Sequence, residues 1–152
     1  MRYQQNCITT KTRSLLAVVA LVFSMVLPQA ALAAGVVASN GKIKLPADDS
    51  IEAPAYVTLE NTTDQEIIVI KVRSSAFDMS MINQSVKDND QPREMLRADL
   101  VLKPNSKLVM KKDGVHILFA GPKKKLKAGN KVTAVFYLSD SEKLSVDFTI
   151  VK

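Results

Sequence analysis

The sequence predicts a single domain built as an antiparallel β-sandwich. Three observations support this prediction: apolar and polar residues alternate with a period of two, turn residues recur about every 8 to 12 positions, and no window shows a sustained helical repeat. The chain has 152 residues, enough for one domain with its own core. It has one His and one Cys, which excludes a zinc finger, a disulfide framework and a CxxC redox pair.

The first 33 residues have the pattern of a secretory signal peptide. Basic residues without any acid precede an almost wholly apolar stretch, Leu15–Leu27, and the small-residue segment Ala31–Ala33 follows. The apolar stretch is short for a membrane span, so we expect cleavage after about Ala33 and no stable membrane anchor afterwards. Cys7 precedes the apolar stretch and therefore cannot be the acylated cysteine of a bacterial lipoprotein. The predicted product is a periplasmic domain, residues 34–152.

Cleavage would also remove much of the positive charge. The full chain has 21 basic and 15 acidic residues, and three of the basic residues lie within the first 33, which leaves 18 against 15. This small excess does not indicate a nucleic-acid partner. One basic run remains, Lys123–Lys125 with Lys127 and Lys131. It is either a solvated turn or a surface that steers an acidic acceptor protein or an anionic membrane.

The strands of the mature chain follow from the alternation and the turn signals. The predicted strands are Ala55–Leu59, Ile67–Val72, Leu100–Leu102, Leu108–Met110, Val115–Ala120, Val132–Leu138 and Leu144–Ile150. The second is apolar on both faces until Lys71, which favours a strand buried inside the sandwich. Two segments do not fit the spacing. Gly35–Pro54 is polar and irregular, with one edge strand expected at Lys42–Leu45, and Met79–Leu96 is expected to be a long connecting loop.

The single histidine lies in one of these strands and is expected on its outer face. In Val115–Ala120 the odd-numbered residues would point into the core, which places His116 and Leu118 on the opposite face. A histidine in that position can meet a loop that folds over it. On the residues alone, the alternative is an ordinary surface or hydrogen-bonded histidine.

Three of the four methionines of the mature chain lie in the expected loop: Met79, Met81 and Met95. If the loop covers the outer face, their thioethers converge with the His116 imidazole. That donor set selects soft ions, above all Cu(I), over zinc, calcium or magnesium. The alternative for the methionines is that they fill gaps in the core.

No catalytic signature accompanies this set. The chain has no GxSxG motif and no P-loop, and a catalytic triad would have to use the one histidine without a supporting local motif. The segment 88–90 has carboxylates but lacks the Gly and the distal Glu of a calcium loop. We therefore expect a protein that is not an enzyme.

Several segments of the mature chain occur in a recognisable order. These are Ala53–Thr62, Leu102–Met110, Asp113–Gly121 and Pro122–Val132. They resemble, over most of the mature chain, the periplasmic copper chaperone family known as PCu(A)C. The resemblance implies a cupredoxin-like β-sandwich of Greek-key type that binds Cu(I), with Cu(II) as an alternative. It also implies delivery to a copper-accepting protein, such as the copper centre of cytochrome oxidase or another periplasmic cuproprotein, by a monomer.

The resemblance also implies a ligand set, in which this sequence departs from the family pattern. His116 matches the second His of the pattern, and Met81 matches a Met near its start. Met79 stands where the first His belongs, and Met95 matches the middle Met after a slip of one residue. Leu118 stands where the closing Met belongs, and it cannot ligate a metal. The expected site is therefore Met79, Met81, Met95 and His116; the alternative is a metal-free interaction module on the same fold, with a degenerate copper site.

Overall fold

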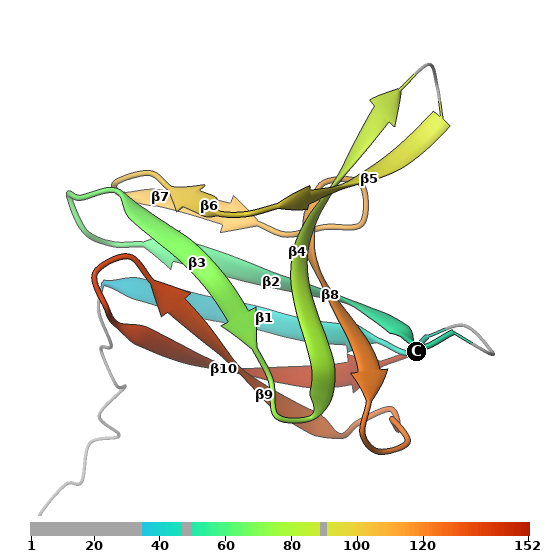
Figure 1. Ribbon diagram of the computed structural model, residues 1–152. Coiled ribbons are helices and arrows are strands. Elements are labelled where there is room, and N and C mark those ends of the chain that lie inside the picture. Colours follow the sequence, from blue (N-terminus) through green and yellow to red (C-terminus); the bar gives the residue numbers. More distant parts are fainter. Residues whose placement is uncertain (1–34, 47–49, 89–90) are drawn as a thin grey trace, which may run out of the picture.

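The computed structural model describes residues 35–46, 50–88 and 91–152, and its regular elements there are all strands (Figure 1). They are β1 (Val36–Lys44), β2 (Glu52–Asn61), β3 (Ile67–Arg73), β4 (Phe77–Asp88), β5 (Gln91–Arg97), β6 (Leu100–Leu102), β7 (Ser106–Val109), β8 (Val115–Pro122), β9 (Lys131–Leu138) and β10 (Lys143–Val151). The all-β prediction is confirmed. The predicted signal peptide and Cys7 lie outside the described residues. Within the described ranges, no helix has the length and apolar character that a membrane span requires.

The strands form one sheet that folds over on itself into two packed layers. Its order is β5-β4-β8-β2-β1-β10-β9-β3-β6, with β7 paired to β2. The neighbouring strands pair antiparallel with one exception: β1 and β10 are parallel, with Lys42 opposite Thr149 and Lys44 opposite Val151. These two strands come from opposite ends of the domain, so no short turn obliges them to run antiparallel.

Aromatic side chains fill the space between the layers. Phe119 of β8 stacks on Phe77 of β4 with ring centroids 4.8 Å apart, and it meets the edge of Phe148 of β10 at 5.9 Å. Phe136 of β9 continues the row, 6.4 Å from Phe148. Burial of Phe119, Phe136 and Phe148 is complete, and side chains of this size dominate the energy of a small core. The predicted inward direction of Ile117 and Phe119 is therefore confirmed.

Two segments that were expected to be irregular are strands. The prediction that Gly35–Pro54 is irregular is wrong, because β1 begins at Val36 and β2 at Glu52. The strand expected at Lys42–Leu45 is present as the end of β1, but it is not an edge strand, because β1 lies between β2 and β10. The prediction of a loop at Met79–Leu96 is also wrong, because β4 and β5 pair from Ile82–Arg97 to Asp88–Gln91. This hairpin projects beyond the body of the sandwich (Figure 1). Its outer part is held by backbone pairing rather than by burial, so apolar alternation could not reveal it.

The apolar run in β3 is buried on one face only. Ile67, Val69 and Val72 are buried, whereas Ile70 is 51% exposed. The pairing of β3 with β9 shifts between Val69 and Lys71, which is the signature of a β-bulge. The extra residue lets Val69 and Val72 both face the core although they are three positions apart. The prediction of a strand buried on both faces is therefore wrong.

Candidate metal centre

Strands β4 and β8 bring two of the predicted donors onto one face beside the histidine. Met79 lies opposite Ala120, Met81 opposite Leu118, and Asn83 opposite His116. Directly paired residues lie on the same side of a sheet, and so do alternate residues along a strand. The thioethers of Met79 and Met81 and the imidazole of His116 therefore project from one face. This face is the outer one, because Ile82 and Ile117, which also pair, are buried in the core.

The two methionines differ in their reach to the histidine. Met81 is the diagonal neighbour of His116, a relationship that places Cα atoms roughly 7–8 Å apart and within reach of long side chains. Met79 lies two residues further along β4, about 13 Å from the position opposite His116. It is also more open, with 54% of its surface exposed. Met81 is thus the nearer thioether to the imidazole, and Met79 lies beyond it.

His116 is held in a fixed orientation although it lies on the outer face. The residue is only 6% exposed, and its Nδ1 lies 3.1 Å from the carbonyl oxygen of Gly114. A carbonyl oxygen only accepts hydrogen bonds, so this contact assigns the proton to Nδ1 and leaves the Nε2 lone pair free in the neutral ring. The same carbonyl accepts the backbone N–H of Ser85 at 3.1 Å. Orientation of an imidazole by a backbone carbonyl is typical of metal-ligating histidines.

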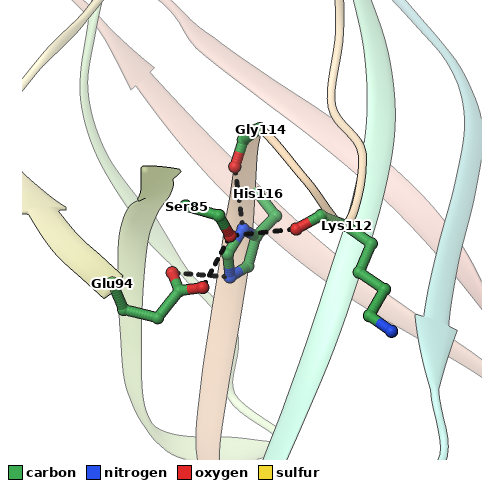
Figure 2. Close-up of polar contacts among 5 residues, drawn as sticks. All are labelled: Ser85, Glu94, Lys112, Gly114 and His116. Carbon is green, nitrogen blue, oxygen red and sulfur yellow. Dashed lines mark hydrogen bonds and ion pairs between the residues drawn. The ribbon is translucent and has the colours of Figure 1, made fainter. Parts of the chain in front are cut away.

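The structure adds a residue that the sequence did not indicate. Glu94 of β5 places its Oε2 atom 3.4 Å from Nε2 of His116 (Figure 2). Its other oxygen, Oε1, accepts a hydrogen bond from the Ser85 hydroxyl at 2.5 Å. The Ser85 hydroxyl also lies 2.9 Å from the carbonyl oxygen of Lys112. The residues of the 111–114 turn and the hairpin therefore converge on the imidazole.

Met95, which follows Glu94 in the chain, does not lie on the face that carries His116. Met95 pairs with Gln84, whereas Glu94 pairs with Ser85. Because successive residues of a strand face opposite sides, Glu94 is on the His116 side and Met95 on the other, where 53% of it is exposed. The one-residue slip seen in the sequence thus exchanges a thioether for a carboxylate beside the histidine. The sequence carries no signal for this register, because a shift of one residue would exchange the two faces of β5.

Neither Leu118 nor Met110 supplies the closing methionine of the family pattern on this face. Leu118 is half-buried beside Met81 and supplies an apolar wall rather than a donor. Met110 is 3% exposed and belongs to the core cluster, so it does not stand in for the missing methionine. Among the described residues, no three His, Cys, Asp or Glu side chains gather as a metal-ligating group. A metal ion on this face would therefore take thioether or solvent donors in addition to His116 and Glu94.

Tyr56 borders the histidine on the β2 side. Its ring centroid lies 6.3 Å from that of His116. Burial raises the pKa of the Tyr56 hydroxyl above its usual value, and the nearby carboxylates of Asp113 and Glu94 raise it further. Two carboxylates therefore act on a side chain whose ring neighbours that of His116.

The lysine run occupies the other end of β8. Pro122 follows His116 by six residues, about 20 Å along a strand, and Lys123–Lys125 come directly after it. Lys123, Lys124, Lys125 and Lys131 line a cleft of about 370 Å³ with an apolar floor that includes Val132 and Ile150. The lysines thus lie far from the imidazole and nearer to Met79, which pairs with Ala120.

The fold is that of PCuAC domains. An apo PCuAC domain from PmoF1 matches with a TM-score of 0.67 and 18% identity, covering 78% of this chain and 95% of that one. A copper-bound PCuAC domain from PmoF2 matches with a TM-score of 0.66 and 15% identity, covering 78% and 93%. The Cu(I) form of DR1885 from Deinococcus radiodurans matches with a TM-score of 0.63 and 23% identity, covering 80% and 82%.

The sequence assigns the chain to a particular family within this fold. Residues 36–150 match the putative lipoproteins described as LpqE-like, and the chain belongs to that family. A search of curated protein sequences finds no match. The expected likeness to PCuAC proteins is confirmed at the level of the fold.

Proposed function

We propose that this chain is an exported copper chaperone that binds Cu(I) on the outer face of β4 and β8. The observation that carries the proposal is the placement of Met81 beside His116 on one face. It is supported by the copper-bound state described for two proteins of the same fold. A thioether and an imidazole are soft and borderline donors that suit Cu(I), and the apolar wall of Leu118 limits access of water to the ion.

Each candidate ligand has a different part in this proposal. His116 supplies Nε2 and Met81 the nearest sulfur, while the exposed Met79 is a sulfur for capture or transfer of the ion. Met95 would join them only if β5 changed its register or orientation. A small and partly exposed ligand set suits a chaperone, because its cargo has to leave by ligand exchange with a copper-accepting protein in the periplasm. Export through residues 1–33 and a monomeric state remain part of the proposal.

Specific observations favour a second candidate, a metal-free interaction module. His116 is already in contact with Glu94 at 3.4 Å, and Leu118 occupies the position of a family methionine. On this alternative, the His116 contacts serve only to position the β4–β5 hairpin.

Cu(I) titration of residues 34–152 against a competing Cu(I) chelator separates the two candidates. The copper proposal expects one Cu(I) per chain, with binding lost in a Met81→Ala/His116→Ala double variant. Circular dichroism on both proteins verifies that the variant is folded. If the unaltered chain binds no more tightly than the folded double variant, the copper proposal fails and the module is favoured.

A further inference from the structure

The contact between His116 and Glu94 joins two hydrogen-bond acceptors. Because Nδ1 donates to the Gly114 carbonyl, Nε2 of the neutral ring presents a lone pair toward Oε2 of Glu94, 3.4 Å away. A carboxylate is also an acceptor. Such a pair is stabilised by a cation between the two atoms, which is either a proton on the ring or a metal ion.

Both side chains of the pair are held in place by hydrogen bonds to atoms other than Nε2 and Oε2. The Ser85 hydroxyl binds Oε1 of Glu94, which leaves Oε2 for the imidazole. The carbonyl of Gly114 fixes the ring from the other side. Figure 2 shows that the Lys112 side chain points away from the pair, so its ammonium does not occupy the position between the two atoms. Hydrogen bonds of this kind, made to the far side of each donor, orient metal ligands.

One member of the Glu94–His116 pair is buried and the other is exposed. The His116 side chain is 8% exposed, whereas that of Glu94 is 51% exposed. An ion can therefore reach the pair from solvent on the carboxylate side while the imidazole stays fixed.

The spacing of the two donor atoms is compatible with a single ion. Donors with metal bonds of about 2.0–2.1 Å lie roughly 2.9 Å apart at a right angle and roughly 3.4 Å apart at the tetrahedral angle. The observed 3.4 Å corresponds to the tetrahedral angle. An ion that prefers donors at a right angle, as Cu(II) does, would require the half-exposed Glu94 side chain to move closer by roughly 0.5 Å.

We propose that Glu94 and His116 form a nitrogen–oxygen pair that binds Cu(II), so that this face holds copper in both oxidation states. Carboxylate and imidazole donors suit Cu(II), and among divalent first-row ions copper binds such donors most tightly. The thioether of Met81 suits Cu(I) instead. The inference rests on the copper-binding role proposed above, and it assigns the two oxidation states to two overlapping sets of donors that share His116.

The test uses Cu(II) and Cu(I) separately on residues 34–152. Cu(II) binding is measured by competition with a Cu(II) chelator and by electron paramagnetic resonance, and Cu(I) binding by the chelator competition described above. Glu94→Gln removes the anionic oxygen at nearly constant size. The matched control is Glu60→Gln, since Glu60 is a strand carboxylate of similar exposure, 45%, that pairs with Lys107 at 2.9 Å.

We expect Glu94→Gln to weaken Cu(II) binding at least tenfold and to change the resonance spectrum, while Cu(I) affinity changes less than threefold. Glu60→Gln should alter neither. Unchanged Cu(II) affinity and an unchanged spectrum in Glu94→Gln, or no Cu(II) binding by the unaltered chain, would overturn the inference and leave an ion pair that only positions the hairpin. Cu(II) binding that depends on Glu94 in a chain that fails to bind Cu(I) would support the Glu94–His116 pair as a Cu(II) site. It would refute both the Cu(I) chaperone proposal and the assignment of two oxidation states to this face.

Discussion

The two faces of β8 differ in what keeps their side chains buried. On the inner face, Ile117 and Phe119 are fully buried among apolar and aromatic neighbours. On the outer face, His116 is almost as buried, at 6% exposure, but it is held by the Gly114 carbonyl and Glu94. The comparison teaches that burial in this protein does not by itself identify the core. The partners of the buried group distinguish packing from a candidate site.

Phe119→Ala, on the inner face of β8, should cause the largest loss of stability. Removing a fully buried ring that contacts Phe77 and Phe148 should lower the free energy of unfolding by about 3–5 kcal/mol, because a cavity remains. Urea denaturation of the metal-free protein measures this loss. Leu118→Ala, on the half-buried outer face, is the control and should cost clearly less. Equal losses would contradict the difference between the faces.

His116→Gln, on the outer face, should reduce copper binding more than it reduces stability. The variant loses the imidazole donor, so Cu(I) affinity should fall about 100-fold, which corresponds to about 2.7 kcal/mol. The Gly114 carbonyl keeps its bond from Ser85, so the free energy of unfolding should fall by only about 1–2 kcal/mol. Chelator competition and urea denaturation measure the two quantities. A stability loss as large as that of Phe119→Ala would make His116 a core residue.

Leu118→Met tests whether the outer face lacks a ligand. The substitution places a thioether on the same face as His116 and opposite Met81, at nearly constant volume. We expect Cu(I) affinity to rise about tenfold, or about 1.4 kcal/mol, in the chelator competition. Leu118→Ile keeps the volume without the sulfur and should leave the affinity unchanged. A similar rise in both variants would point to packing instead of ligation.

Met95→Ala should have the smallest effect. Its side chain lies on the face opposite His116, so Cu(I) affinity should change less than twofold, whereas Met81→Ala should reduce it about tenfold. The same chelator competition compares the two single variants. A loss for Met95→Ala equal to that for Met81→Ala would show that β5 moves when the ion binds.

Much of the fold was accessible from the sequence because the core strands have one buried and one open face. In β2 and β10, buried and more exposed residues alternate along the strand, and this is the signal that apolar periodicity detects. The β4–β5 hairpin was missed for the opposite reason. Its polar outer part gains its order from pairing with another strand, and a polar strand has no apolar alternation to detect.

For the candidate site, the sequence identified the residue types better than their positions. His116, Met79 and Met81 were indicated because the methionines cluster in one segment expected to cover the histidine, and because part of the PCu(A)C pattern is kept there. The pairing of β4 with β8 places the three side chains on one face. Met95 and Glu94 are adjacent in the sequence, and only the register of the hairpin determines which of them faces the imidazole. A shift of one residue exchanges the two faces of a strand, so the sequence alone could not select Glu94.

The sequence by itself determined the all-β class, the inward direction of the apolar residues in β8, and a donor inventory limited to one histidine and a few methionines. These properties are local, because they follow from the period of the side chains and from composition. The tertiary structure decided the parallel pairing of β1 with β10, the hairpin at 77–97 and the contact between Glu94 and His116. Those features depend on pairing between segments distant in the chain, and backbone hydrogen bonds between strands carry no signature in the residue types that form them.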